Sequence, residues 1–121
     1  MDFSLGSSEL KFQELVWANE PINSGELAKL ALLHLDWKKS TTYTVIKKLC
    51  EKGFLISSNA VVMARITRKE YYHMIAFDFV REYFNGSFPD FIASYRDGNQ
   101  LTRDELFDMY NALKSYNEGE K

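Results

Sequence analysis

Residues 37–69 read WKKSTTYTVIKKLCEKGFLISSNAVVMARITRK, and this stretch decides the expected fold. It holds eight Lys or Arg residues and one acid, Glu51, although the whole chain of 121 residues has a net charge of −2. Hydroxyl and aromatic side chains at positions 40–44 open a helical pattern that continues through Leu49. Hydroxyl groups at the start of a helix can reach base edges, and flanking cations are attracted to phosphates. The stretch therefore predicts a DNA recognition helix.

Two helical patterns precede this stretch. Serines at positions 7 and 8, followed by Glu9, predict a hydroxyl cap and an acidic first turn, and residues 19–21 end the first helix. Asn23 and Glu26 have the spacing of a capping box, so a second helix is expected to begin there. Four apolar residues are expected on its buried face: Leu27, Leu30, Ala31 and Leu33.

The third helix is expected to be capped by Ser40 or Lys39, to run to about Lys52 and to stop at Gly53, the residue type that commonly follows a helix end. Three helices in this order, the last two joined by a short turn, predict a helix-turn-helix of the tri-helical kind. Residues 54–57 and 61–66 are typical of two short strands. A hairpin directly after a recognition helix is the wing of a winged helix.

The rest of the chain predicts three further helices rich in aromatic residues. Capping boxes at Thr67 and Thr102 predict helices over residues 68–84 and from residue 103 onward. A shorter helix begins near Pro89 and ends before a loop at 96–99. Three such helices cannot bury so many aromatic rings among themselves, which predicts that a second copy of the chain covers them. The candidate dimer-interface residues are Phe77, Val80, Phe84, Phe88, Phe91, Ile92, Tyr95, Leu106, Met109, Tyr110 and Leu113.

The predicted fold is mainly α with a small β-hairpin: a winged helix-turn-helix followed by a C-terminal helical dimerisation domain. We place the winged-helix DNA-binding domain at residues 1–70 and the dimerisation domain at residues 71–121. The first segment has ten basic and eight acidic residues, a net charge of +2, whereas the second has five and nine, a net charge of −4. A basic front and an acidic back are consistent with a nucleic-acid face joined to a segment that avoids nucleic acid.

The candidate DNA contacts fall into two groups. Base contacts are expected from Ser40, Thr41, Tyr43 and Thr44 at the start of the recognition helix. Phosphate contacts are expected from Lys38, Lys39, Lys47, Lys48, Arg65 and Arg68. A twofold dimer would place two recognition helices about 34 Å apart, one turn of double-stranded DNA, and so would require a palindromic operator.

Several motifs resemble those of the penicillinase and methicillin-resistance repressors. They are Leu5, Ser7, Glu9, Glu14 and Trp17, then Asp36 and Trp37, then TTYTVxxxLxxKGF from Thr41 to Phe54, and finally Tyr83, Gly86, Phe88, Leu101, Thr102, Glu105 and Leu106. The resemblance covers nearly the whole chain. It implies a homodimeric winged-helix repressor of β-lactamase genes or of its own operon. In antibiotic-responsive members, a membrane-bound sensor protease signals β-lactam, and the repressor is cleaved in its dimerisation domain.

The chain departs from the pattern of those repressors at the recognition helix. Tyr43 stands where members matched to β-lactamase operators have Arg, and Ser40 stands where they have Lys. Arginine contacts guanine with two hydrogen bonds and tyrosine cannot, so a different operator is expected. The cleavage position of the family falls near Ser94 and Tyr95, where those members have Asn-Phe. The tail at 115–121 lacks the cysteine pairs of the copper-responsive branch.

Other classes of function find little support. The single cysteine, Cys50, excludes an internal disulfide and a multi-cysteine zinc site, and His34 and His73 lie far apart in the sequence, so we expect no metal and no cofactor. Phosphate-binding loops and nucleophile motifs are missing, so an enzyme is not expected. The chain has neither a signal peptide nor a membrane span, which predicts a cytoplasmic protein.

Two alternatives to an operator-binding repressor stay open. The first is a winged-helix regulator that binds a small-molecule effector in its aromatic C-terminal half, which predicts a thermal shift with a hydrophobic ligand. The second is a winged-helix protein-interaction module, which predicts a recognition helix poor in cations. The third helix of this chain is rich in them.

Overall fold

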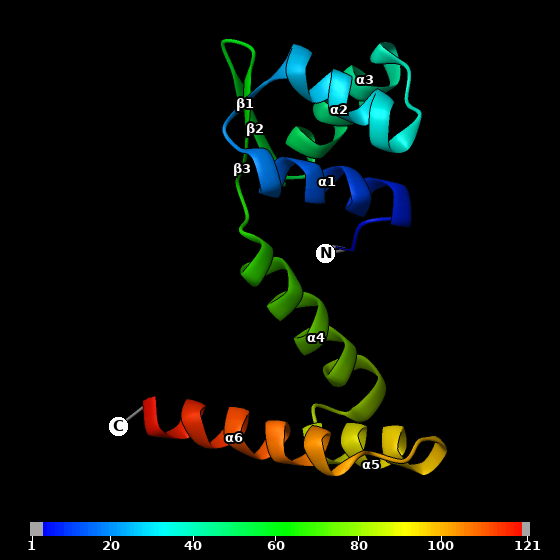
Figure 1. Cartoon of the computed structure of the whole chain (residues 1–121), viewed down its shortest axis with the longest axis vertical. Coiled ribbons are helices and arrows are strands. Elements are labelled where there is room, and N and C mark those ends of the chain that lie inside the picture. The colour runs from blue at the N-terminus through cyan, green and yellow to red at the C-terminus, as the bar shows by residue number, and fades with distance from the viewer. Residues whose placement is uncertain (1–3, 120–121) are drawn as a thin grey trace. The chain divides into compact units, whose positions relative to one another are not determined.

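The computed structural model describes residues 4–119, which form six helices and a three-stranded antiparallel sheet (Figure 1). The expected fold class, mainly α with a small β-hairpin, is confirmed. Contacts between residues divide the chain into unit 1, residues 1–77, and unit 2, residues 78–121. This division falls inside the fourth helix, whereas the sequence placed a boundary between residues 70 and 71, near the start of that helix.

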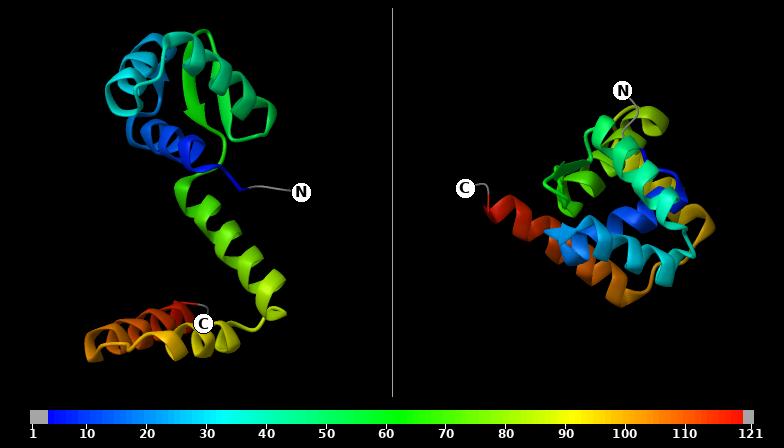
Figure 2. Two further views of the ribbon diagram at one scale, coloured as in Figure 1. Left: turned by 90° about the vertical axis from the view of Figure 1, so that its right-hand side faces the viewer. Right: turned by 90° about the horizontal axis from the view of Figure 1, so that it is seen from above.

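Unit 1 is built on three helices: α1 (Ser7–Asn19), α2 (Ser24–Leu35) and α3 (Lys39–Glu51). Figure 2 shows these helices and the adjoining hairpin from two further directions. Their inward faces meet in one apolar core, and burial of that apolar surface is the main source of stability. The core residues are Phe12, Val16, Leu27, Ala31, Ile46, Leu49, Phe54, Leu55, Val62 and Tyr71. The ring of Trp37, in the turn between α2 and α3, stacks on Phe12 with the ring centroids 5.2 Å apart.

The starts of the first two helices differ from the expectation in detail. Gly6 caps α1, and its amide donates to Oε1 of Glu9 at 3.1 Å. The expected hydroxyl cap is wrong because both serines lie within the first turn of the helix. Asn23 caps α2 as expected, with its side chain accepting from the amide of Gly25 at 2.8 Å.

The buried face of α2 also differs from the expectation. Leu27 and Ala31 are buried as expected, together with Ala28, and Leu30 is half-buried. The prediction that Leu33 is buried is wrong, because its side chain is 75% exposed. Leu33 follows Ala31 and precedes the turn into α3, so the helical repeat carries it away from the core.

The predicted cap of α3 at Ser40 or Lys39 is wrong, because Lys38 is the N-cap residue and both predicted residues lie within the first turn of the helix.

The end of α3 follows the expected pattern. Gly53 has a φ of +88°, a left-handed conformation that glycine adopts without strain. Its amide donates to the carbonyl of Cys50 at 3.1 Å, and the amide of Phe54 donates to the carbonyl of Leu49 at 2.9 Å. This pair of bonds is the Schellman motif, in which two carbonyls at the helix end find donors. Because Phe54 and Leu49 are both buried, the motif also fixes where the chain enters the sheet.

The sheet has the strand order β1-β3-β2 and is antiparallel throughout. β2 (Leu55–Ser58) and β3 (Val61–Ala64) form the expected hairpin, and β3 is shorter than predicted. Asn59 and Ala60 form its two-residue turn, both with positive φ, as hairpin turns of this length require. β1 (Ile22–Asn23) pairs with β3 and was not predicted, because two residues are too short to show any periodicity.

The last three helices are α4 (Arg68–Phe84), α5 (Phe88–Gly98) and α6 (Arg103–Gly119). Both predicted capping boxes are present: Thr67 and Glu70 exchange hydrogen bonds before α4, as do Thr102 and Glu105 before α6. The loop predicted at 96–99 is wrong for most of its length, because α5 continues to Gly98. Ser87 caps α5 by accepting from the amide of Asp90 at 3.2 Å.

Unit 2 is poorly buried for a segment so rich in aromatic residues. None of residues 78–115, the part of unit 2 whose side chains are described, is buried. Its aromatic rings touch one another, and Phe91 is central, with ring centroids 5.5 Å from Phe84 and 5.9 Å from Phe79. These rings make local contacts, and yet a large apolar area stays exposed to water in the single chain.

Replacing Thr42 should test the packing behind α3. Thr42 is fully buried, and its hydroxyl has no hydrogen-bond partner among the described residues. Valine has the same branched shape without the hydroxyl, so Thr42→Val should raise the free energy of unfolding by about 1 kcal/mol. Denaturant titration measures this. The exposed Thr41→Val is the control and should change stability by less than about 0.5 kcal/mol. A loss of stability in Thr42→Val would contradict an unpaired hydroxyl.

Candidate nucleic-acid interface

α3 has one buried face and one exposed face. Thr42, Ile46 and Leu49 point into the core of unit 1. All four predicted base-contacting residues, Ser40, Thr41, Tyr43 and Thr44, are exposed. Since the core anchors the opposite face, these side chains are held on the outside of the helix-turn-helix. The structure brings them together within the first two turns of α3.

Two of these side chains, Thr44 and Tyr43, make contacts within unit 1 that limit the groups they can present to a ligand. The Thr44 hydroxyl donates to the carbonyl of Ser40 at 3.0 Å, so its methyl group and its oxygen lone pairs are what it can present outward. The ammonium of Lys39 lies over the ring of Tyr43, 5.8 Å from the centroid. This cation–π contact ties a predicted phosphate contact to a predicted base contact.

The predicted phosphate contacts divide into free and paired cations. Lys38, Lys47 and Arg65 are exposed, and no carboxylate within residues 4–115, the residues whose side chains are described, pairs with them. Lys48 Nζ lies 3.2 Å from Oε2 of Glu9, and Arg68 pairs with Glu14. The sequence did not predict these pairs, because residues of α1 and residues of α3 or α4 are far apart along the chain.

Glu9 is the centre of a small charge network. Its side chain is only 17% exposed, accepts from the Gly6 amide, and lies 3.2 Å from Lys48 Nζ and 3.5 Å from Lys52 Nζ. Burial alone would raise the pKa of this carboxyl, but the Gly6 amide and the two ammonium groups outweigh burial and hold the pKa below its usual 4.5. Glu9 therefore stays ionised at neutral pH and ties α1 to the flank of α3.

The wing is uncharged over its whole length. Residues 55–64 include no Lys, Arg, Asp or Glu. Arg65 lies just beyond β3, where its amide donates to the carbonyl of Phe54 at 2.9 Å. Ile56 and Met63 face each other across the strands, and both are exposed. The nearest cation of the wing is therefore at its base and not at its tip.

The predicted dimer-interface residues all lie on α4, α5 and α6. Phe77, Phe88, Tyr95, Leu106, Tyr110 and Leu113 are exposed, and Val80, Phe84, Phe91, Ile92 and Met109 are half-buried. Among residues 78–115, three further exposed aromatic residues, Phe79, Tyr83 and Phe107, are absent from the predicted set. They lie on the same helices, so a count of all aromatic residues, without a chosen helical face, would have found them. Ser94 and Tyr95, at the family's cleavage position, lie inside α5 and are exposed.

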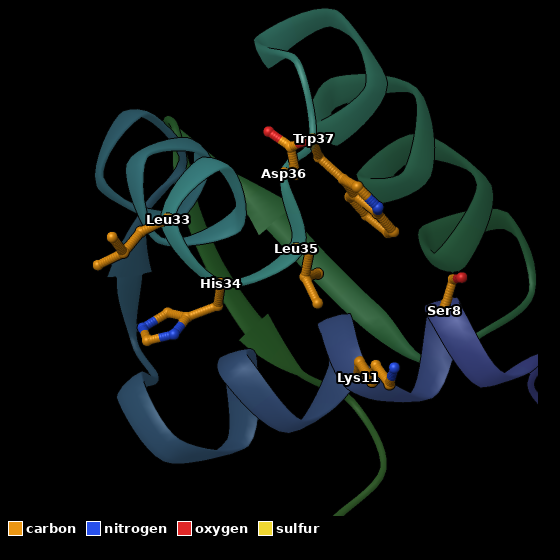
Figure 3. Close-up of a pocket in the computed structure, with 7 residues that line it drawn as sticks. All are labelled: Ser8, Lys11, Leu33, His34, Leu35, Asp36 and Trp37. Atoms are coloured by element: carbon orange, nitrogen blue, oxygen red, sulfur yellow. The ribbon is translucent and has the colours of Figure 1, made fainter.

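A cavity of about 340 Å³ lies in unit 1 between α1 and the end of α2 (Figure 3). Its lining residues are Ser8, Lys11, Leu33, His34, Leu35, Asp36 and Trp37. The side chains mix one ammonium, one imidazole and one carboxylate with apolar groups, and they come from a different part of the chain than the aromatic C-terminal half. The cavity shows no constellation typical of catalysis.

Metal binding and membrane insertion find no support in the described part of the chain. Among the side chains of residues 4–115, no three of His, Cys, Asp or Glu gather closely enough to hold a metal ion. The helices that are described are too short or too polar to span a lipid bilayer. Cys50 is half-buried, and burial raises the pKa of its thiol, so it is a small packing residue of α3.

A family model and the sequences of known proteins both relate this chain to repressors and regulatory proteins of antibiotic resistance. The family model described as penicillinase repressor matches residues 5–115. The chain is 22% identical to the penicillinase repressor of Bacillus licheniformis, over 97% of this chain and 94% of that protein. It is 19% identical to the methicillin resistance regulatory protein MecI of Staphylococcus aureus, over 92% and 94% respectively. These relatives act in gene regulation and are not enzymes.

Solved structures that resemble this chain include two transcriptional regulators. Tm0710 from Thermotoga maritima is 23% identical, with 99% of this chain and 81% of that chain covered and a TM-score of 0.48. A MarR family regulator from Silicibacter pomeroyi is 21% identical, with 98% and 72% covered and a TM-score of 0.46.

The Glu9 network should make stability depend on pH. Because the folded-state pKa of Glu9 is lowered, its contribution to stability is present above the usual pKa of 4.5 and is lost as pH falls through the folded-state value. Glu9→Gln should therefore unfold at a lower temperature than the native chain at pH 7, and the difference should shrink below pH 4.5. Thermal unfolding followed across pH tests this. A difference that stays constant with pH would mean that the carboxylate charge is not responsible.

Proposed function

The chain belongs to the penicillinase repressor family, and from this premise we propose that it is a homodimeric transcriptional repressor that binds a palindromic DNA operator. The observation that carries the proposal is the exposed face of α3. Hydroxyl groups and one aromatic ring gather on its first two turns, and an unpaired cation, Lys47, follows on the same helix. A helix held in this way by a helix-turn-helix core is the element that enters the major groove in proteins of this fold.

Sequence readout is proposed for Thr41, Tyr43 and Thr44. Threonine hydroxyls can bond to several base edges, and a threonine methyl or a tyrosine ring can contact the methyl group of thymine. The Thr44 hydroxyl already donates to Ser40, which favours apolar contact by its methyl group. Tyrosine cannot make the paired hydrogen bonds by which arginine selects guanine, so the operator differs from those read by arginine-bearing relatives.

Phosphate contacts are proposed first for Lys38, Lys39, Lys47 and Arg65. Each has an exposed ammonium or guanidinium group, and a cation near a phosphate gains affinity by releasing counterions from DNA. Lys48 and Arg68 belong to the same predicted set, but their pairs with Glu9 and Glu14 would have to break or be shared before they reached a phosphate. We therefore expect them to contribute less.

A second copy of the chain is the partner proposed for the exposed rings of α4, α5 and α6. An apolar area of this extent is uncommon on a monomer and is typical of an interface. Net negative charge on this half would keep the interface away from the phosphates. A twofold dimer presents the same face from both copies, which matches the symmetry of a palindromic operator.

The target and the signal are proposed from the family. Relatives that carry the names penicillinase repressor and methicillin resistance regulatory protein favour a β-lactamase or another antibiotic-resistance operon. Release of the operator by a membrane-bound sensor protease would require cleavage near Ser94 and Tyr95. Because both residues lie within α5, the helix would have to unwind locally before a protease could cut there.

Fluorescence anisotropy with DNA from upstream of the gene, and with a scrambled control, tests operator binding. We expect a preference of about 10³ or more for the upstream DNA, and affinity that falls steeply as salt rises. Thr41→Ala should weaken specific binding by about 1–3 kcal/mol and leave binding to scrambled DNA unchanged. Lys47→Ala should weaken binding to both DNAs equally. It should also reduce the slope of the logarithm of affinity against the logarithm of salt concentration by about one.

Other outcomes of this titration are informative. Equal losses for Thr41→Ala on the two DNAs would rule out base readout by this residue. Weak and equal binding of the native chain to both DNAs, repeated with other promoters, would favour the protein-interaction module. A native chain that releases DNA on addition of a hydrophobic ligand, with its length unchanged, would favour the small-molecule regulator.

Charge placed on the exposed face of α6 should break the dimer. Leu113→Glu puts a carboxylate where the proposed interface is apolar, and burying an unpaired charge is strongly unfavourable, so the dimer dissociation constant should rise about 100-fold or more. Asn111→Glu adds the same charge to the same helix outside the predicted face and should leave the dimer intact. Sedimentation equilibrium measures both. Identical behaviour of the two variants would contradict the predicted face, and a monomeric native chain would contradict the dimer.

A further inference from the structure

Four side chains, Arg68 among them, gather at the first turns of α4, all within unit 1. We call them the Arg68 cluster: Glu14 and Trp17 of α1, and Arg68 and Tyr72 of α4. The guanidinium of Arg68 donates to Oε2 of Glu14, and the Tyr72 hydroxyl donates to Oε1 of the same carboxylate at 3.1 Å. The guanidinium also lies over the Trp17 ring, 5.6 Å from its centroid. The two oxygens of the Glu14 carboxylate thus accept hydrogen bonds from side chains in two successive turns of α4.

Hydrogen bonds between side chains and the backbone also fix this junction. The Trp17 indole donates to the carbonyl of Ile66 at 2.9 Å, just before α4 begins. Tyr71 is buried in the core of unit 1, and its hydroxyl accepts from the Leu5 amide at 3.1 Å. The Trp17 and Tyr71 rings lie 5.8 Å apart. The chain is therefore held at Ile66, immediately before α4, and at Arg68, Tyr71 and Tyr72 in the first two turns of the helix.

The cluster is poorly suited to a purely stabilising role. Side chains that are 50% exposed for Arg68 and 36% for Glu14 gain little free energy from an ion pair, because water screens the charges. The arrangement is nonetheless directional: the planar guanidinium of Arg68 and the phenol of Tyr72 both reach Glu14 on α1, and the guanidinium also lies over the Trp17 ring of that helix. Burial and the bond to Glu14 raise the pKa of the Tyr72 hydroxyl, so it stays protonated as a donor.

We infer that the Arg68 cluster fixes the direction in which α4 leaves the winged helix, and that it thereby sets the half-site spacing that a dimer accepts. The inference rests on the proposed function of the chain as a dimeric operator-binding repressor. It assigns Glu14, Arg68 and Tyr72 as positioning residues for spacing, and it gives Arg68 a role different from the phosphate contact expected from sequence.

The length of α4 explains why a small angle matters. The helix has 17 residues and so spans about 25 Å. A tilt of about 10° at its first turn would displace its far end by about 4 Å, more than the roughly 3.4 Å rise of one base pair. Without the cluster, the helix would be attached through Tyr71 and the backbone alone, and neighbouring spacings would become acceptable.

The test compares operators that differ only in spacing. A palindromic operator is first selected from random DNA with the native full-length chain, and versions with one base pair inserted or removed at the centre, and a single half-site, are then prepared. Dissociation constants are measured for the native chain, Glu14→Met and Tyr72→Phe. Glu26→Met is the matched control, because it breaks an exposed ion pair with Lys29 outside the cluster.

We expect the native chain to lose affinity when the spacing changes. In Glu14→Met, the ratio of dissociation constants between altered and selected spacing should fall by about threefold or more, as coupling within such networks allows. Tyr72→Phe removes one hydroxyl only and should shift the ratio in the same direction, which keeps the test valid if Glu14→Met fails to fold. Half-site affinity should be unchanged in both, and Glu26→Met should keep the native ratio.

Two results would overturn the inference while leaving the proposed function intact. One is a native spacing ratio in both cluster variants, or a native chain that binds its selected operator but accepts every spacing. The other is a loss of half-site affinity as large as the loss on the full operator, which would make the cluster part of DNA recognition itself. Failure of the native chain to select any sequence would instead overturn both the function and the inference.

Discussion

Burial of one face of α3 is the constraint on which the rest of the structure depends. Thr42, Ile46 and Leu49 are held in the core by α1, α2 and the sheet, so the opposite face cannot turn inward. The hydroxyls of Ser40, Thr41 and Thr44 and the ring of Tyr43 face water as a consequence. The Schellman motif at Gly53 then fixes the exit of the chain, so the position of the hairpin follows from the end of the same helix. A surface for recognition therefore results from core packing.

α1 controls the charge of this surface as well as its support. Glu9 neutralises lysines on the flank of α3, and Glu14 holds Arg68 at the start of α4. A count of the Lys and Arg residues in the sequence thus overstates the number of cations available to a phosphate. Among the predicted phosphate contacts, no described carboxylate pairs with Lys38 just before α3, with Lys47 on the outer face of α3, or with Arg65 at the base of the wing. Fewer free cations would weaken attraction to DNA of any sequence and leave a larger share of affinity to base contacts.

The sequence carried enough information for most of the fold, because the signals involved are local. Capping boxes at Thr67 and Thr102 and the glycine at position 53 act within a few residues, and the helices they bound appeared as predicted. The sequence did not predict β1, because its pairing depends on β3, some forty residues away in the chain. The ion pairs of Glu9 and Glu14 were not predicted for the same reason, because their partners are distant along the chain. Residue types at the candidate interface could be predicted, but their division into free and paired cations required the tertiary contacts.

The dimer proposed for unit 2 would supply what a single winged helix lacks. One recognition helix reads only a few base pairs, and two half-sites bound together gain affinity because the second contact becomes intramolecular. That gain is large only where the connection between the halves matches the separation of the sites. The exposed rings of α5 and α6 would join the copies, and α4 would carry the separation, so specificity depends on how firmly α4 is held at its start. Unit 1 holds the start of α4 by the buried ring of Tyr71 and by the carboxylate of Glu14, which would make α1 a structural link between the proposed base readout and the proposed dimer geometry.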